Sequence, residues 1–430
     1  MSTSAYHDTK AGTAPPPPGC PIDHDWSPLS AEYLRDPYAV AAQLRERGGA
    51  FYAEQLGYVV ITSMADIEAV FTDHETFAST NVQDPVFPLD ERAQAVLGAP
   101  DFDPIAVMSN RPEPDHGRIR VFTRQGFSNR RLKMIEPFIR ARTTELIDRM
   151  LAQGPPAEFV QAVAFPLPGE TVFRWIGFPH EDDDQLKQWC LGRKSFSWGH
   201  PTGDEQTAIA EQLLAYWRYS RDFVAAKREH RGDDFTSELL DAHEADPDAL
   251  SYPEVESIVY GLSFAGHEPV TALLSNCLLC LLSRREQWDE LCADPSLVVN
   301  AVEEVLRYES SQISWRRVTT RPTTLAGYDL PAGTKIFMNF AAANRQPDVF
   351  EDADRFDIHR PNANRNISFG KGIHYCLGAM LAKVEARIVV AELAARVPSL
   401  RLVADQSITH SANITFRGPE RLLVDWDTDG

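Results

Sequence analysis

A single cysteine near the C-terminus lies in a setting suited to metal chemistry. The stretch 368–378 reads Ser-Phe-Gly-Lys-Gly-Ile-His-Tyr-Cys-Leu-Gly, and an uninterrupted helical pattern begins at Ala379. Glycines at positions 370 and 372 permit positive φ angles and let the backbone approach a flat group closely. A cysteine at a helix start meets unpaired N–H groups and the positive end of the helix dipole, which favour its thiolate. Such a thiolate is a suitable axial ligand for haem iron.

The whole string around this cysteine is more informative than the cysteine alone. A lone cysteine is more often a small core residue than a ligand, but Phe-Gly-x-Gly-x-His-x-Cys-x-Gly fixes six identities over ten positions. The string resembles the haem-binding loop of soluble bacterial cytochromes P-450. That resemblance implies that Cys376 is the proximal ligand of the iron of haem b and that Phe369 packs beside the sulfur. It also implies that His374 reaches a haem propionate and that Gly378 belongs to the same cofactor loop.

A second pair of residues fits the same cofactor. His116 and Arg120 are four residues apart, so they share one face of a helix. Alone, such a pair is usually part of a solvated helix face. The resemblance implies instead that both bind haem propionates, to which a guanidinium is well suited. Arg317 falls where the family has a further propionate ligand, although the adjacent Arg316 is an alternative.

The longest helical pattern contains an unusual sequence. It begins with a capping box at Ser251 and Glu254, and it is apolar on nearly all faces from 258 to 282. We therefore expect a central buried helix. Its interior reads Ala-Gly-His-Glu-Pro-Val at 265–270, although an interior proline costs about 3 kcal/mol. A tolerated kink is the simplest interpretation.

The family resemblance gives this sequence a function, because the oxygen-binding groove of these enzymes lies there. The usual pattern is a small residue, glycine, any residue, an acid and then a threonine that helps to deliver protons. Ala265, Gly266 and Glu268 match it, whereas Pro269 replaces the threonine and Val270 supplies no hydroxyl. The first four of these are the candidate catalytic residues. Proton delivery is left to Glu268, an ordered water or a substrate hydroxyl.

A third motif is expected to be structural. Glu304 and Arg307 match the E-x-x-R motif of the family, and Arg360 matches the arginine that completes its buried triad. An acid three residues before an arginine is otherwise a common surface pair. We expect these three residues to support the fold and to take no part in the chemistry.

Composition limits the class of protein and its partners. The 430 residues are 43% hydrophobic and 24% charged, which is ordinary for a soluble globular protein. A net charge of −20 without a basic stripe argues against a nucleic-acid partner. No signal peptide or membrane span is expected, and six scattered cysteines suit a reducing cytoplasmic location. Cys277 and Cys280 lie in an apolar helical run, so core packing is the favoured interpretation of this pair.

The expected fold is mainly α. The resemblance implies the cytochrome P-450 fold, with about a dozen helices around a buried haem and small β-sheets. Residues 1–27, with four consecutive prolines, form an extended or disordered tail, and 28–430 form one catalytic domain. The patterns predict helices near 132–152, 157–176, 182–197 and 203–230 and a hairpin over 50–62. They also predict an irregular stretch at 78–110 that covers the pocket and a mobile break at 198–204.

The resemblance implies a haem-thiolate monooxygenase, an oxidoreductase of EC class 1.14. Such an enzyme inserts one oxygen atom from O2 into a small organic substrate. No flavin or iron–sulfur domain follows Gly430, so electrons are expected from a ferredoxin or flavodoxin served by an NAD(P)H-dependent reductase. The side chains expected to line the substrate pocket are Phe87, Phe196, Ile313 and Ser314. We expect an aromatic substrate that is hydroxylated or O-demethylated.

Three alternatives remain open at this point. Relatives that act on fatty acids as peroxygenases or decarboxylases also carry a proline at this place. They have an arginine before it, whereas Glu268 would repel a carboxylate. Tailoring of a natural product is a second alternative. The third is a haem-based sensor that has lost oxygen activation together with the threonine.

Overall fold

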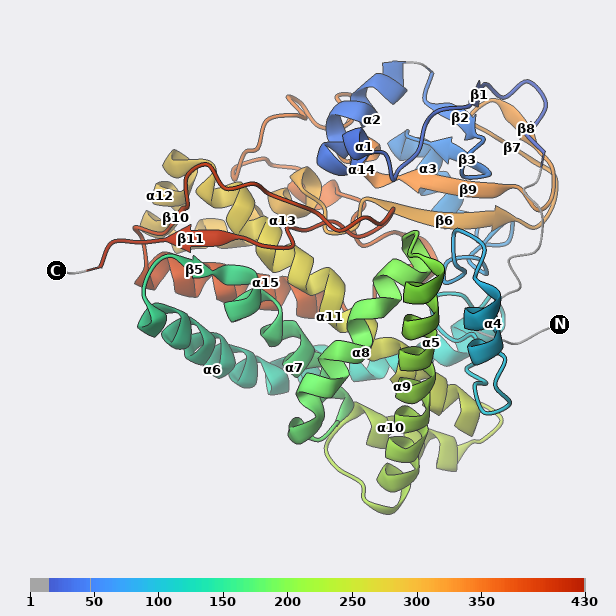
Figure 1. Ribbon diagram of the computed structural model, residues 1–430, viewed down its shortest axis with the longest axis horizontal. Helices are drawn as coiled ribbons and strands as arrows, with labels where there is room; N and C mark the ends of the chain where they lie inside the picture. The colour runs from blue at the N-terminus through green and yellow to red at the C-terminus, as the bar shows by residue number, and fades with distance from the viewer. Residues whose placement is uncertain (1–14, 47, 429–430) are drawn as a thin grey trace.

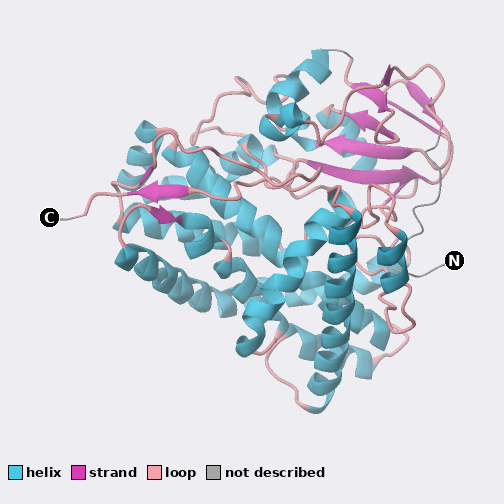
Figure 2. Cartoon of the chain, in the orientation of Figure 1, coloured by secondary structure: helices cyan, strands magenta, loops and turns pink. Residues whose placement is uncertain are grey.

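The computed structural model describes residues 15–46 and 48–428 of the chain (Figure 1). Within them the chain forms fifteen α-helices and three β-sheets, so the expected mainly α fold is confirmed. Helices fill most of the molecule, and the largest sheet lies along one side of it (Figure 2).

The helices expected near 132–152, 182–197 and 203–230 are present. In the first half of the chain the helices are α1 (Ala31–Arg35), α2 (Pro37–Glu46), α3 (Met64–Thr72), α4 (Glu91–Leu97), α5 (Asp115–Gly126), α6 (Asn129–Gln153), α7 (Pro166–Ile176), α8 (Asp183–Trp198) and α9 (Gly203–Glu229). In the second half they are α10 (Phe235–Ala245), α11 (Tyr252–Leu282), α12 (Arg285–Ala293), α13 (Val298–Tyr308), α14 (Phe340–Ala343) and α15 (Ala379–Arg396).

The largest sheet joins four strands from residues 22–78 with two strands from residues 314–339. Its six strands lie in the order β1 (Ile22–Asp23), β2 (Ala50–Ala53), β3 (Tyr58–Ile61), β9 (Lys335–Asn339), β6 (Ser314–Thr319) and β4 (Phe77–Ala78). Strands β2 and β3 pair antiparallel with Phe51 opposite Val60, which confirms the predicted hairpin. The smaller sheets contain β10 (Arg401–Leu402), β11 (Leu423–Asp425) and β5 (Ala157–Glu158), and then β7 (Thr323–Leu325) and β8 (Tyr328–Leu330).

Helix α11 is the central element of the fold. The backbone N–H of Ser251 donates to Glu254 Oε2 at 2.8 Å, so the predicted capping box is present. The helix crosses the middle of the molecule and packs against α7, α8, α9 and α15 (Figure 1). By length and hydropathy it could cross a membrane, but 67% of its most apolar window is buried inside the protein, as in a core helix.

The paired cysteines of α11 belong to the hydrophobic core. Cys277 and Cys280 are both buried, and burial raises the pKa of Cys277 to about 12. In the described part of the chain, no group of three or more histidine, cysteine or acidic side chains could hold a metal ion. These observations agree with core packing for the pair.

Two stretches differ from the sequence-based expectation. The helix expected over 157–176 is divided into β5, a π-helical turn (Val160–Ala164) and α7, which begins at Pro166. Proline suits the first turn of a helix, so Pro166 starts a new helix and does not interrupt an existing one. The stretch 78–110 is not wholly irregular, since it contains α4, for which Asp90 is the N-cap.

The last part of the predicted N-terminal tail belongs to the fold. Residues 1–14 lie outside the described residues, but the predicted tail up to residue 27 is wrong for its last part. Ile22 pairs with Tyr52 in the large sheet. Trp26 is buried, with its ring centroid 5.7 Å from Tyr33 and 5.4 Å from Phe51. The strand has two residues and follows a run of prolines, so no periodic pattern revealed it.

Candidate active site

The cysteine loop folds as its glycines predict. Gly370 has a φ of +70° and Gly372 a φ of +71°. A Cβ atom at Gly372 would lie 2.4 Å from the carbonyl oxygen of Phe71, so a larger residue does not fit there. The backbone N–H of Cys376 donates to the Phe369 carbonyl at 2.9 Å and closes the loop.

Cys376 lies just before α15, which has Gly378 as its N-cap. Burial raises the pKa of the Cys376 thiol, whereas the N–H groups of Gly378 and Ala379 and the Arg120 guanidinium lower it. A metal ion overrides this balance, because a coordinating thiol is deprotonated outright. Cys376 lines an internal cavity that residues of α11 also line. The sulfur is therefore available to an iron ion held inside the protein.

Four basic side chains gather beside this cavity, and they come from α5, β6 and the cysteine loop. The ring centroids of His116 and His374 are 4.1 Å apart, and His374 Nε2 lies 3.2 Å from Ser79 Oγ. Arg120, Arg317 and His374 line the cavity. The structure thus brings together the four residues that the sequence analysis selected as propionate ligands.

The electrostatics of this cluster suit an anionic cofactor. Burial, with the nearby charges of Arg317, His116 and Arg120, lowers the pKa of His374 to about 2. Burial also lowers the pKa of Arg317 to about 9. His116 Nε2 is buried and has no hydrogen-bond partner among the described residues. Two carboxylates placed here would neutralise the positive charges of Arg120 and Arg317 and would give His116 Nε2 a hydrogen-bond partner. These residues therefore fit the propionates of haem b.

The choice between the adjacent arginines follows from strand geometry. Side chains along a strand alternate between its two faces. In β6, Arg317 lines the cavity, whereas Arg316 donates to the carbonyl oxygens of Val82 and Asp84 at 2.8 Å each. Arg317 is therefore the residue of the pair that could reach a propionate.

Another part of the cavity wall is formed by the unusual sequence in α11. Ala265, Gly266 and Pro269 line the cavity. A Cβ atom at Gly266 would lie 2.5 Å from a methyl carbon of Val172, so glycine permits the close packing of α11 on α7. Pro269 has no N–H to donate to the carbonyl of Ala265, four residues earlier. This carbonyl is therefore left to accept a hydrogen bond from elsewhere.

Glu268, the fourth candidate catalytic residue, does not line the cavity. Its buried carboxylate faces α8, where Lys194 Nζ lies 2.9 Å from Oε2. The side chain of Lys194 is 21% exposed. A buried acid is thus connected to the protein surface through an ammonium group.

Comparison with known proteins agrees with this geometry. The model of the cytochrome P-450 family matches residues 292–396. Cytochrome P-450 107B1 of Saccharopolyspora erythraea is 36% identical over 328 residues, which cover 76% of this chain and 78% of that protein. The chain belongs to the cytochrome P-450 family. It is therefore a haem-thiolate monooxygenase, an oxidoreductase with haem b as its cofactor.

Solved structures of the family extend the likeness over almost the whole chain. The cytochrome P-450 CREJ, solved with (4-ethylphenyl) dihydrogen phosphate, is 36% identical with a TM-score of 0.90. The match covers 94% of this chain and all of that one, 100%. An intact type IV self-sufficient cytochrome P-450 monooxygenase is 33% identical with a TM-score of 0.92, and the match covers 97% of this chain and 55% of that chain. These likenesses confirm the cytochrome P-450 fold.

None of the four residues expected to line the substrate pocket is among those that line this cavity of the cytochrome P-450. Phe87 stacks on His200 with ring centroids 4.2 Å apart, and Phe196 is buried in the hydrophobic core. Ile313 is buried, and Ser314 donates its hydroxyl proton to the Ile414 carbonyl at 2.6 Å. The residues that line the cavity in this region are their neighbours, Ser311, Gln312, Trp315 and Arg317.

Two charged residues of the cavity wall were not found from the sequence. Arg193 of α8 follows Leu186 and Cys190 at helical spacing on the buried face, which was the available signal. Glu385 of α15 is also buried, and burial raises its pKa to about 8. A charged residue on the apolar face of a helix is uncommon in a protein interior.

The structure also brings together the three residues expected to support the fold. Glu304 accepts from Arg307 Nε and Nη2 at 2.7 Å each and from Arg360 Nε at 3.1 Å. Glu304 and Arg307 are fully buried, and Arg360 is 6% exposed. One carboxylate thus compensates two buried guanidinium groups.

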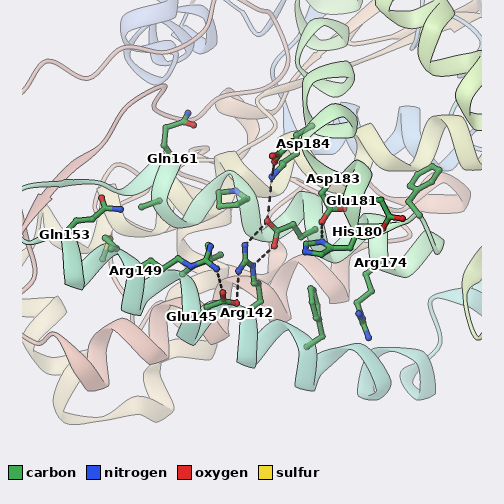
Figure 3. Close-up of a pocket in the computed structure, with 18 residues that line it drawn as sticks. Arg142, Glu145, Arg149, Gln153, Gln161, Arg174, His180, Glu181, Asp183 and Asp184 are labelled. Atoms are coloured by element: carbon green, nitrogen blue, oxygen red, sulfur yellow. Dashed lines mark hydrogen bonds and ion pairs between the residues drawn. The ribbon is translucent and has the colours of Figure 1, made fainter.

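A second cavity of about 860 Å³ opens between α6, α7 and α8 (Figure 3). Its charged side chains pair with one another, as Arg142 does with Glu170 at 3.0 Å and Lys187 does with Asp184 at 2.7 Å. It contains none of the predicted site residues. The inner cavity, which holds Cys376, is therefore the candidate active site.

The triad gives a direct test of its structural role. We expect Glu304→Gln to lower the free energy of unfolding by about 3–5 kcal/mol, because removal of one partner leaves buried charges uncompensated. Glu290→Gln is the control, since Glu290 pairs with His359 at 2.8 Å with both side chains about half exposed, and we expect a loss below about 1 kcal/mol. Denaturant unfolding of the haem-loaded variants measures the loss in the free energy of unfolding for each of them. Equal losses in the two variants would contradict the structural role.

Proposed function

We propose that this cytochrome P-450 places one oxygen atom from O2 into a small aromatic substrate, by hydroxylation or by O-demethylation. The observation that carries the proposal is the wall of the inner cavity, where four aromatic side chains meet. The ring centroid of Trp198 lies 5.6 Å from Phe264, 5.1 Å from Phe416 and 6.0 Å from Trp315. All four residues line the cavity. Aromatic walls of this kind favour a flat aromatic ligand through offset and edge-to-face contacts.

A structural neighbour supports the same substrate class. CREJ was solved with a ligand whose organic part is a single substituted benzene ring. The similarity to this chain covers the complete CREJ chain, so it includes the elements that form the cavity. A single-ring substrate is thus the choice that both the wall and the neighbour favour.

In this proposal the cofactor-binding residues have separate tasks. Cys376 ligates the iron of haem b, and Phe369 and Gly378 belong to its loop. His116, Arg120, Arg317 and His374 hold the propionates. Bound haem supplies oxygen activation. The chain itself binds and orients the substrate in a cavity that excludes bulk water.

Glu268 is proposed as the proton donor in place of the missing threonine. Pro269 and Val270 carry no hydroxyl, whereas the Glu268 carboxylate is one residue away and is linked to Lys194. The partly exposed ammonium group can exchange protons with solvent and pass them to the buried carboxylate. From Glu268, protons reach the cavity at the point where Pro269 interrupts the hydrogen bonds of α11.

Electrons are proposed to come from a ferredoxin or flavodoxin that is reduced by an NAD(P)H-dependent reductase. We also propose a cytoplasmic location, since all six cysteines are free in the structure and a reducing compartment keeps thiols in this state. Reconstitution with a ferredoxin and its reductase tests the electron source.

The iron ligand is tested by Cys376→Ser. Because a serine hydroxyl does not supply a thiolate, we expect the reduced carbon monoxide complex to lose the absorbance band typical of thiolate-ligated haem. Cys292→Ser is the matched control, since Cys292 lies half-buried on α12, away from the cavity. An unchanged thiolate band in Cys376→Ser would refute the assignment.

The proton donor is tested by Glu268→Gln, which keeps the shape of the side chain and removes its acid. General acid–base catalysis contributes about 10²–10⁴-fold, so we expect product formation to fall by a factor in this range. The solvent isotope effect should rise, while the spin-state change on substrate binding is retained. Glu268→Asp should recover part of the activity. Full activity of Glu268→Gln would exclude this role.

The substrate class is tested by a spectral titration of the ferric protein with guaiacol, methoxybenzoates, aromatic amino acids and fatty acids. We expect a low-to-high-spin change with a single-ring aromatic, followed by hydroxylated or demethylated product in the reconstituted system. A response to fatty acids alone would overturn the aromatic assignment and favour the fatty-acid alternative. Spin-state changes with aromatic ligands that yield no product under any electron supply would favour the sensor.

A further inference from the structure

Three arginines line the inner cavity, and one of them is not accounted for by the cofactor. Arg120 and Arg317 belong to the cluster that suits the haem propionates. Arg193 comes from a different element, α8, and lines the cavity next to the aromatic wall. We propose that the substrate carries an anionic group, a carboxylate or a phosphate monoester, and that Arg193 binds it. This inference rests on the proposed function for the aromatic part of the substrate.

The guanidinium of Arg193 is held in a defined position. Its side chain is buried, with 7% of the residue exposed. The guanidinium carbon lies 5.2 Å from the ring centroid of Tyr260 and 5.7 Å from that of Phe264, within the range of cation–π contacts. Nη2 donates to Gln83 Oε1 at 3.4 Å, and Gln83 Nε2 donates to Ser109 Oγ at 2.9 Å. This arrangement keeps a planar, charged hydrogen-bond donor at the cavity wall.

The charges around the cavity favour an anion over a neutral ligand. Among the described residues that line it, Glu385 is the only carboxylic acid, and burial raises its pKa to about 8, so it is largely protonated near pH 7. Glu268 does not line the cavity, and Lys194 compensates its charge at 2.9 Å. The repulsion of a carboxylate that the sequence suggested for Glu268 is therefore weakened. A guanidinium binds carboxylate or phosphate oxygens in a bidentate manner.

Arg193 borders the aromatic wall of the cavity. Its guanidinium carbon lies 5.7 Å from the ring centroid of Phe264, and that ring lies 5.6 Å from Trp198 and 5.9 Å from Phe416. A substituted benzene ring packed on this wall could therefore place an anionic substituent at Arg193.

A matched set of ligands on the haem-loaded protein tests this inference. The probes are 4-methoxybenzoate, 4-methoxyphenyl phosphate and the neutral 4-methoxybenzamide, with octanoate as an anion that lacks the ring. Spin-state titration gives a Kd for each. A charge-assisted hydrogen bond corresponds to roughly a tenfold to hundredfold change in affinity, so we expect one or both aromatic anions to bind more tightly than the amide by this factor. The preferred anion distinguishes a carboxylate from a phosphate substrate.

Three variants assign the effect to Arg193. Arg193→Gln should weaken binding of the preferred anion about tenfold to a hundredfold, while the Kd of the amide stays within about threefold. Arg193→Lys should retain part of the preference, because it keeps the charge and loses the planar fork. Arg218→Gln is the control, since Arg218 is an exposed arginine on α9 that pairs with Asp101 at 2.6 Å, and it should leave all affinities unchanged.

The outcomes separate this inference from the proposed function. Equal affinities of the wild-type protein for the amide and both anions would overturn the anion inference and leave the aromatic proposal standing. If Arg193→Gln weakened the binding of the amide and of the anion equally, Arg193 would only support the cavity wall. That result would also overturn the anion inference. Arg193-dependent binding of octanoate without binding of any aromatic probe would uphold the anion site and overturn the aromatic substrate. The comparison of amide and anion affinities in the wild-type protein tests the anion inference even if a variant does not fold.

Discussion

The structure depends on one spatial constraint: the cysteine loop and α11, far apart in the sequence, must line one cavity. Cys376 and Pro269 both line it. Two glycines permit this arrangement, because Gly266 lets α11 pack closely on α7 and Gly372 lets the loop pass against the backbone at Phe71. The basic cluster supplies charge to this cavity, and the triad supports its cysteine loop.

The proximal wall is positioned by a chain of buried polar contacts that starts at the triad. Arg307, held by Glu304, donates through Nη1 to the Asn344 carbonyl at 3.0 Å. Asn344 Nδ2 donates to Ser368 Oγ at 3.1 Å, and Ser368 Oγ donates to the Leu306 carbonyl at 2.6 Å. Ser368 is the first residue of the cysteine loop. The triad therefore supports the loop that carries Cys376, the proposed iron ligand.

Local features of this chain could be predicted from its sequence, and features that depend on side-chain direction could not. The capping box at Ser251 and the positive φ angles at Gly370 and Gly372 are consequences of neighbouring residues alone. The cavity lining depends on which face of β6 points inward. A shift of one residue exchanges the two faces, so Ser314 was expected where Trp315 lies. The burial of Arg193 was not predicted because arginine is mostly exposed in proteins, and only its helical spacing from Leu186 and Cys190 indicates the buried face of α8.

The two proposed roles of substrate contact and proton supply fall on two consecutive residues of α8, Arg193 and Lys194. Residues one position apart on a helix point about 100° away from each other, so Arg193 faces Tyr260 while Lys194 reaches Glu268. The same helix ends at Trp198, whose carbonyl accepts from the N–H of Ile414 at 2.8 Å. Because a helix moves as a rigid element, a displacement of α8 would move Trp198, Arg193 and Lys194 together. It would therefore change the aromatic wall, the position of the Arg193 guanidinium and the ion pair of Glu268 at the same time. A substrate bound at the proposed Arg193 site would therefore contact the same helix that holds Lys194 against Glu268.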